Sequence, residues 1–303
     1  MKRKSGLSKF NTFLCVVLVI CIVATIYVVA KPIKVEQETN EVEDVAVIDE
    51  FVAGTYGGKE FSSVEDVVNY YVECYNYTKT LTAEYDENGE SKTYYKLLGS
   101  EKIEVSNILV EGKSNSMING LVPGIVGGLF SGGLNGLCPS GNRNPDLDTK
   151  GDNGEYDCRT SALTPDDVLA ANVVDNGDGT INITIQPKAV ILSMPMQDAQ
   201  GRFFNTLGDI SSVVESISVL SFSQGTIDEN FVVNYMGGTG TATIDTATGE
   251  IVSGNYVMKV HVDVQHANVT VLKDKSAALD ITYTCLYPAD AQYMLDTKGV
   301  KAK

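Results

Sequence analysis

The pattern of apolar and polar positions becomes regular near Phe61, where we place the start of the folded domain. Ser62 and Glu65 stand three residues apart, the spacing of a capping box at the N-terminus of a helix. The apolar residues that follow recur at intervals of three and four: Val64, Val67, Val68, Tyr71 and Tyr75. This spacing predicts one amphipathic α-helix.

Beyond that helix the chain mostly alternates between apolar and polar residues, which predicts half-buried β-strands. Residues 82–97 form a predicted hairpin that turns at Asn88 and Gly89, a pair typical of two-residue turns. A second predicted hairpin spans residues 173–186 and places three isoleucines at alternate positions on one face.

Residues 231–287 are predicted to form four or five antiparallel strands, which are separated by turn residues. The last of these strands places Cys285 on its apolar face. Short helices are predicted at residues 163–173, where Thr164 is the cap, and at residues 208–217. Together these elements predict the α+β class, with the amphipathic helix and the short helices packed on an antiparallel sheet.

A different pattern occupies the N-terminus, where residues 12–30 carry no charge, glycine or proline. As a helix they would extend about 28 Å, close to the hydrocarbon thickness of a bilayer. We predict an uncleaved, single-pass transmembrane signal anchor in the cell membrane, with the basic residues 1–11 in the cytoplasm. Residues 31–60 are then an acidic linker, and residues 61–303 an extracytoplasmic domain. The alternative is a cleavable signal peptide, because "VVA" before Lys31 resembles a cleavage site.

The charge is distributed as unevenly as the hydropathy. The first 30 residues hold four basic residues and no acid, and the rest of the chain holds 19 Lys and Arg against 39 Asp and Glu, a net charge of −20. Such an exterior repels phosphate backbones and anionic lipid headgroups. We therefore expect no nucleic-acid partner, and contact with the cell membrane only through the N-terminal helix.

Between Gly120 and Gly136, glycine recurs at every fourth position in an apolar and uncharged stretch. Small residues allow close helix packing, yet each glycine disfavours an isolated helix by about 0.8–1 kcal/mol. Four interpretations stay open: a segment packed under the sheet, the lining of an apolar ligand cavity, an exposed partner surface, and a second membrane span. The candidate lining residues are Leu121, Ile125, Leu129 and Phe130.

Four cysteines lie in the predicted extracytoplasmic part, where disulfides are stable. Cys138 and Cys158 bracket a loop of about 20 residues, whose closure contributes about 3 kcal/mol in the chain-entropy model. Cys74 lies at the edge of the helical stripe, so it meets Cys285 if helix and sheet pack face to face. We predict the bonds Cys138–Cys158 and Cys74–Cys285. The alternative is that all four cysteines stay reduced.

One stretch between these cysteines matches a calcium-binding loop. Asp146, Asp148, Gly151 and Asp157 occupy positions 1, 3, 6 and 12 of such a loop, which needs oxygen ligands around a sharp glycine turn. Lys150 stands at position 5, which is normally a ligand. The three aspartates are therefore candidate calcium ligands, and the alternative is a solvated acidic loop.

The two histidines, His261 and His266, lie in one predicted strand. His261 and Asp263 share its polar face, about 6.6–6.8 Å apart along the strand. This placement suits two ligands of one metal ion, and the alternative is that both side chains are simply solvated. His266 falls on the opposite face unless a bulge intervenes. A catalytic triad would need one of these histidines, and no nucleophile motif accompanies them. We expect neither an enzyme nor a cofactor.

An early amphipathic helix followed by long antiparallel strands is similar to the half-barrel lipid-binding proteins of bacterial envelopes, the lipoprotein-carrier type. The stretches "VVDNGDGTINI" and "IDTATGEIV" also resemble hairpins of uncharacterised bacterial extracytoplasmic proteins. The resemblance covers residues 61–287 in outline and implies a membrane-anchored protein of the bacterial cell envelope. It transfers no functional residue.

These features favour binding over catalysis. The leading hypothesis is an apolar or lipid-like ligand, held between the sheet on one side and the helix with the glycine-rich segment on the other. The alternative is a cell-surface interaction or adhesion module that binds an envelope protein and is stabilised by calcium. A hydrolase is the third hypothesis.

Overall fold

The computed structural model describes residues 44–114, 160–204, 206, 208, 220–269 and 272–303. Among these residues, no helix has the length and apolar character that a bilayer span requires. The predicted anchor at 12–30 and almost all of the helix predicted at 208–217 lie outside them. So do three groups of candidate site residues, which stay untested: Leu121, Ile125, Leu129 and Phe130 of the glycine-rich segment, the calcium ligands Asp146, Asp148 and Asp157, and the pair Cys138–Cys158.

Strands account for 51% of the described structure and helices for 18%. The strands are β1 (Gly54–Tyr56), β2 (Lys59–Phe61), β3 (Thr82–Glu87), β4 (Glu90–Tyr95), β5 (Ser100–Val110), β6 (Lys113–Ser114), β7 (Val168–Asp175), β8 (Thr180–Pro187), β9 (Val190–Ile191), β10 (Leu220–Phe222), β11 (Phe231–Asp245), β12 (Ile251–Val269), β13 (Leu272–Tyr287) and β14 (Lys301–Ala302). The helices are α2 (Val64–Thr78), α4 (Ala199–Phe203), α6 (Ile227–Asn230) and α7 (Ala291–Lys298), with a 3-10 turn, η2 (Pro165–Asp167). The predicted α+β class is therefore wrong, because the fold is predominantly β.

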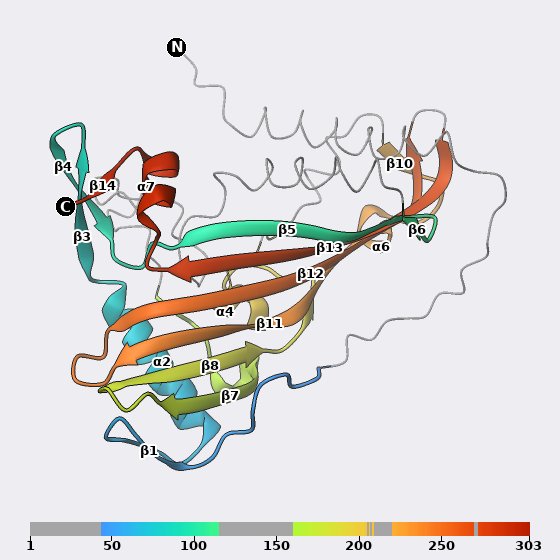
Figure 1. Cartoon of the computed structure of the whole chain (residues 1–303). Coiled ribbons are helices and arrows are strands. Elements are labelled where there is room, and N and C mark those ends of the chain that lie inside the picture. The colour runs from blue at the N-terminus through green and yellow to red at the C-terminus, as the bar shows by residue number, and fades with distance from the viewer. Residues whose placement is uncertain (1–43, 115–159, 205, 207, 209–219, 270–271) are drawn as a thin grey trace.

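One large antiparallel sheet forms the body of the molecule (Figure 1). Its strand order is β6-β5-β13-β12-β11-β8-β7, with β9 paired to β11 and β10 paired to β12. A smaller sheet, β14-β3-β4, stands beyond one end and shares a separate apolar cluster with α7, formed by Tyr94, Leu98, Met294 and Val300. The hairpin predicted at Asn88 and Gly89 is confirmed as β3–β4.

Residues 231–287 form three long strands, β11, β12 and β13, instead of the predicted four or five. Gly237 and Gly238 look like a turn in the sequence, yet they form a bulge inside β11, between the pairs Tyr235–Val260 and Gly238–Met258. A bulge inserts an extra residue without ending the strand. The turn residues in the sequence therefore predicted more strand ends than the structure has.

The helix predicted at residues 163–173 is also wrong. Only the single turn η2 follows the cap Thr164, and β7 begins at Val168. β7 pairs with β8 and buries Val173 against it. The β-branched residues of this segment pack well on a pleated sheet, and the neighbouring strand satisfies their backbone groups.

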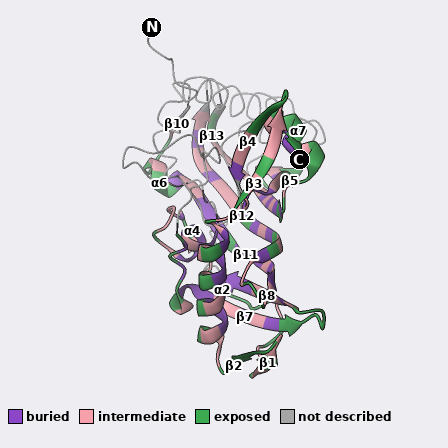
Figure 2. Cartoon of the chain, turned by 90° about the vertical axis from the view of Figure 1, so that its left-hand side faces the viewer, coloured by how far each residue is buried: buried purple, intermediate pink, exposed green. Residues whose placement is uncertain are grey.

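The amphipathic helix is confirmed as α2, which lies against β7, β8 and β12 on one face of the sheet (Figure 2). Its cap is Ser63, whose hydroxyl accepts from the backbone N–H of Asp66, while the Asp66 carboxylate accepts from the backbone N–H of Ser63. The capping box is therefore one residue later than the predicted pair Ser62 and Glu65.

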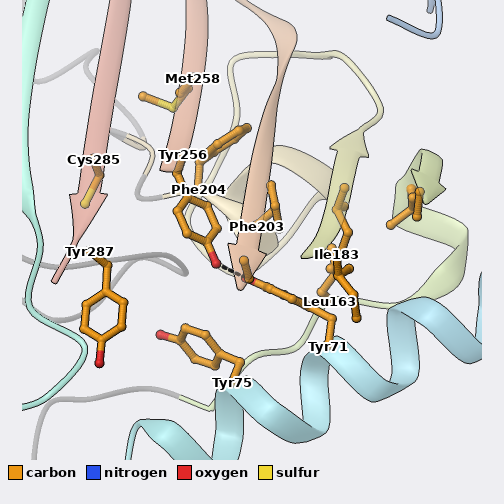
Figure 3. Packing of buried hydrophobic residues seen from close by; sticks show 14 of the residues in the cluster. Tyr71, Tyr75, Leu163, Ile183, Phe203, Phe204, Tyr256, Met258, Cys285 and Tyr287 are labelled. Carbon is orange, nitrogen blue, oxygen red and sulfur yellow. Dashed lines mark hydrogen bonds between the residues drawn. The ribbon is translucent and has the colours of Figure 1, made fainter. Parts of the chain in front are cut away.

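The space between α2 and the sheet is filled by aromatic side chains (Figure 3). The Tyr71 and Tyr256 hydroxyl groups lie 2.9 Å apart. The ring of Phe203 packs between the rings of these two tyrosines and that of Phe204. The distances between ring centres are 5.8 Å to Tyr71, 5.7 Å to Tyr256 and 4.8 Å to Phe204. All four rings are at most 2% exposed, so helix and sheet enclose a solid core.

The chain joins the fold before Phe61, earlier than the predicted domain boundary. β1 and β2 form a hairpin whose tip donates the Gly57 N–H to the Asp175 carboxylate at the end of β7, at 2.7 Å. Upstream of it, the Val47 N–H donates to the side-chain oxygen of Gln186 at 2.8 Å. The predicted linker at 31–60 therefore contributes its last part to the domain.

Cys74 and Cys285 are both buried thiols, and the disulfide predicted between them is not formed. Helix and sheet do pack face to face, but the two sulfur atoms lie beside different residues. Cys74 Sγ lies near Gly249 in the turn between β11 and β12, and Cys285 Sγ lies against Gly99, just before β5. Burial raises the pKa of the Cys74 thiol to about 11, which keeps it protonated and unreactive at neutral pH.

Candidate functional site

The outer face of the sheet, opposite α2, carries a group of uncharged polar side chains that we call the hydroxyl–amide patch. Its members are Asn182 and Thr184 of β8, Thr241 and Thr243 of β11, and Ser253 and Asn255 of β12. Their neighbours along each strand, such as Ile183 and Ala242, point into the core and are 0% exposed. The patch therefore follows from the alternation of a strand that is buried on one side.

Hydrogen bonds between strands order this patch. The Thr184 and Thr241 hydroxyl groups lie 2.9 Å apart, and the Thr243 hydroxyl donates to Asn182 Oδ1 at 2.8 Å. Asn255 stands opposite Thr241 and is exposed. Hydroxyl groups retain acceptor sites after such bonds, so the patch presents donors and acceptors on rigid strands without a charge.

A second polar group on the same face continues across β12, β13 and β5, and we call it the His261 cluster. It consists of His261, Asp263, Asp280 and Asn107. His261 Nδ1 lies 2.5 Å from Asp280 Oδ1, and His261 Nε2 lies 3.2 Å from Asp263 Oδ2. Asn107 Nδ2 donates to the other oxygen of Asp280 at 2.6 Å. The sequence prediction that His261 and Asp263 share a polar face is confirmed.

The geometry of this cluster suits a protonated imidazole ring bound between two carboxylates better than it suits a metal ion. The two carboxylates contact opposite nitrogens of the ring, so His261, Asp263 and Asp280 do not converge on one point. No group of three or more metal-ligating side chains that could hold an ion occurs in the described ranges. Burial by itself lowers the pKa of His261, but the hydrogen bond to Asp280 and the charges of Asp263 and Asp280 outweigh it, so the pKa lies above the usual value.

Replacing His261 with glutamine is expected to remove a pH-dependent part of the stability. Because the pKa of folded His261 is raised above its unfolded value of about 6.5, its contribution is fully present below that pH and is lost as pH rises through the folded pKa. Urea titrations should show a larger difference between wild type and His261→Gln at about pH 5.5 than at about pH 9. An equal difference at both values would contradict the assignment of a charged imidazole.

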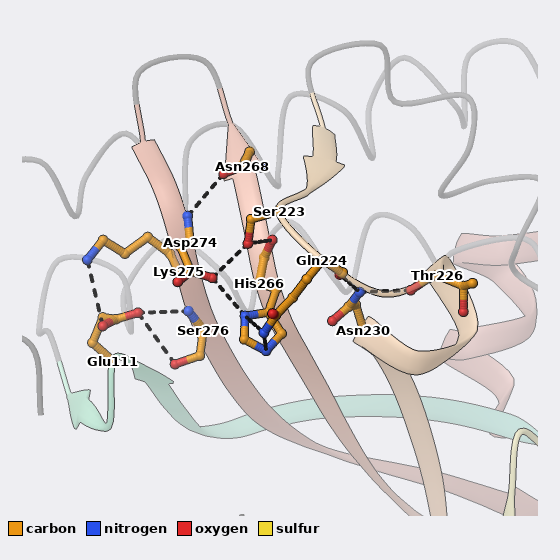
Figure 4. A network of polar contacts seen from close by, with 10 residues as sticks. All are labelled: Glu111, Ser223, Gln224, Thr226, Asn230, His266, Asn268, Asp274, Lys275 and Ser276. Carbon is orange, nitrogen blue, oxygen red and sulfur yellow. Dashed lines mark hydrogen bonds and ion pairs between the residues drawn. The ribbon is translucent and has the colours of Figure 1, made fainter. Parts of the chain in front are cut away.

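His266 reaches its partners through a bulge between Val264 and Ala267, where its own φ is 51°. Its Nδ1 lies 2.7 Å from the carboxylate of Asp274, which also accepts from the Ser223 hydroxyl at 2.8 Å. Figure 4 shows how these side chains meet between the strands. A Ser-His-Asp triad instead requires the hydroxyl to bond to the imidazole. Here both groups bond to the carboxylate, so the hydrolase hypothesis gains no activated serine from these residues.

The leading sequence hypothesis placed an apolar ligand between the sheet on one side and the helix with the glycine-rich segment on the other. The glycine-rich segment lies outside the described residues, and the space between α2 and the sheet is occupied by the aromatic core. A surface hollow of about 370 Å³ lies beside the start of α2, but its lining includes the charged residues Lys59, Glu60, Asp66 and Glu73. This lining is unsuitable for an apolar molecule.

Sequence reasoning missed the hydroxyl–amide patch, although its signal is present. The stretches "TINITI" and "TGTATI" alternate hydroxyl or amide residues with small or apolar ones, and the structure pairs them as β8 and β11.

Comparisons with protein-family models, curated proteins and solved structures found no match to this chain. The resemblance to lipoprotein carriers therefore stays a prediction.

Proposed function

We propose that this chain is a membrane-anchored extracytoplasmic interaction module, which binds an envelope protein through the hydroxyl–amide patch. The observation that carries the proposal is the lack of charge on this patch in a chain whose residues 31–303 have a net charge of −20. The centres of protein interfaces are depleted of charged residues, because a charge that loses water without gaining a partner is costly.

Two further features support a surface role. The patch lies on the central strands β8, β11 and β12, which hold its side chains in fixed positions. In the part of the chain that the structure describes, the aromatic core also fills the space between α2 and the sheet, so an apolar ligand there would have to displace side chains that are almost fully buried. Anchoring by residues 12–30 would keep the module at the cell surface, where such a partner resides.

Photo-crosslinking in intact cells that carry the full chain tests this proposal. A photoreactive phenylalanine analogue at the exposed Asn255 is expected to yield one discrete protein adduct. The same analogue at the exposed Glu65, on α2 and away from the outer face, is the matched control and should yield none. Adducts at neither position, or equally at both, would refute the role of the patch. Stoichiometric lipid in native mass spectra of the purified chain would favour the apolar-ligand hypothesis instead.

A further inference from the structure

The Gln186 side chain binds a stretch of extended backbone on the outer face of the sheet. By the alternation of β8, Gln186 stands on the same face as Thr184 of the hydroxyl–amide patch. Its Nε2 donates to the Val45 carbonyl at 2.8 Å, and its Oε1 accepts from the Val47 N–H at 2.8 Å. Gln186 is only 4% exposed, so both bonds are shielded from water. The carboxamide thus binds this stretch as a neighbouring strand would, with one donor and one acceptor.

Two further contacts hold this stretch, residues 44–50, which we call the strap. The Asp44 carboxylate accepts from the Ala189 N–H at 2.8 Å, and the Asn172 side-chain amide donates to the Asp49 carbonyl at 3.1 Å. With the two bonds above, every second residue of the strap directs a backbone group at the sheet, as in an extended strand. Figure 1 shows the strap in blue, beside β7 and β8.

Polar contacts, most of them to backbone atoms, hold the strap in place of buried side chains. Val45 is 60% exposed and Val47 is 68% exposed. Asp49 and Glu50 are exposed as well. The next residue, Phe51, packs against the core and ends the weakly held part. Main-chain hydrogen bonds give affinity for an extended segment without selecting its side chains. A segment of another protein with the same backbone geometry can therefore take the place of the strap.

We propose that the Gln186 carboxamide receives an extended segment of the envelope partner, which displaces the strap. This inference rests on the proposed function and names the form in which the partner binds beside Thr184. The charge of the strap favours the exchange. Asp49 and Glu50 belong to a chain whose residues 31–303 have a net charge of −20, so a neutral or basic segment meets less repulsion here than the strap does.

A variant of the full chain that weakens the strap tests the exchange. Val47→Pro removes the N–H that the strap donates to Gln186, so the strap competes less strongly for the carboxamide. The probe is a fluorescent peptide with the sequence of residues 44–50, in which lysine replaces Asp49 and Glu50. Fluorescence anisotropy should show that it binds Val47→Pro about two- to tenfold more tightly than the wild type, the change that one net hydrogen bond produces.

The matched control variant is Ala46→Pro. Within the described residues, the Ala46 N–H has no hydrogen-bond partner, as expected for the side of an extended strap that faces away from the sheet. Ala46→Pro therefore keeps the bonds between the strap and Gln186, and its affinity for the peptide should equal that of the wild type.

Two methylated peptides test the backbone contact on one and the same protein, so a folding defect cannot produce their difference. N-methylation at the position of Val47 removes the donor to Gln186 and should weaken binding to Val47→Pro about tenfold. N-methylation at the position of Ala46 should leave binding unchanged. The unmethylated peptide that keeps Asp49 and Glu50 should bind more weakly than its lysine counterpart at low salt.

The outcomes separate this inference from the proposed function. No saturable binding to Val47→Pro, equal affinity of Val47→Pro and the wild type, equal binding of the two methylated peptides, or tighter binding of the acidic peptide would each overturn it. An adduct at Asn255 together with any of these results would retain the hydroxyl–amide patch and reject the extended segment at Gln186. Peptide binding as expected without an adduct at Asn255 would retain the Gln186 site and reject the patch.

Discussion

Gly238→Ala is expected to destabilise the fold by about 2–5 kcal/mol, or to prevent folding. At this position φ is +99°, and an added Cβ would lie 2.1 Å from the Val257 carbonyl oxygen. An L-residue in a left-handed conformation costs about 1–2 kcal/mol, and overpacking a fixed site costs about 1–3 kcal/mol more. The carbonyl oxygen belongs to the neighbouring strand β12, so it cannot move without disturbing the pairing of β11 with β12.

Gly89→Ala is the matched control for this prediction. Gly89 has a φ of +91°, and no atom lies within 4 Å of the position its Cβ would take. Gly89→Ala should therefore lower the free energy of unfolding only by the cost of the left-handed backbone conformation, about 1–2 kcal/mol. Urea unfolding followed by far-UV circular dichroism suits a chain without tryptophan. Equal losses in the two variants would show that the contact with Val257 is not rigid.

Asp167→Ala is expected to cost about 3 kcal/mol of unfolding free energy. The Asp167 side chain is 10% exposed, and both its oxygens contact Arg202 Nη1, at 2.9 and 3.1 Å. One of these oxygens also accepts from the backbone N–H and the hydroxyl of Thr164, at 2.9 and 2.7 Å. Removing the carboxylate leaves a largely covered guanidinium without this partner, and that uncompensated charge is the main source of the loss.

A double-mutant cycle tests that explanation. Asp167→Ala combined with Arg202→Met removes both charges, and the pair should cost clearly less than the sum of the single changes. The adjacent and exposed Asp166→Ala is the control, and it should change stability by about 0.5 kcal/mol at most. Additive losses in the cycle would show that the carboxylate acts through Thr164 rather than through Arg202.

The sequence predicted elements whose determinants are local. The helical stripe around Tyr71 and the turn at Asn88 and Gly89 depend on residues a few positions apart, so their patterns were sufficient. The segment after Thr164 was different, because its choice between helix and strand was decided by β8. Likewise, Gly238 is a bulge rather than a turn because β12 continues opposite it. Such contacts with another strand leave no periodic signal in the segment itself.

In the candidate site, too, the sequence predicted local features but not contacts between different strands. Strand parity correctly placed His261 and Asp263 on one face, because parity is a local property. Asp280 was not predicted as a partner, since it comes from the next strand and depends on the register of β12 with β13. The bond predicted between Cys74 and Cys285 required a distance between helix and sheet residues, which the apolar pattern cannot supply.

The position of β13 in the sheet has a consequence for the order of folding. β13 lies between β5 and β12, and the hydroxyl of Tyr283 donates to Glu101 across 182 residues of sequence. A chain that leaves the ribosome or crosses a membrane from its N-terminus presents β5 long before this neighbour exists. Contacts so distant in sequence slow folding, and an unpaired strand is prone to aggregate in the interval. A chain truncated before Leu272 would therefore separate β5 from the sheet, whereas losing only the last residues after Lys298 would leave every strand of the large sheet in place.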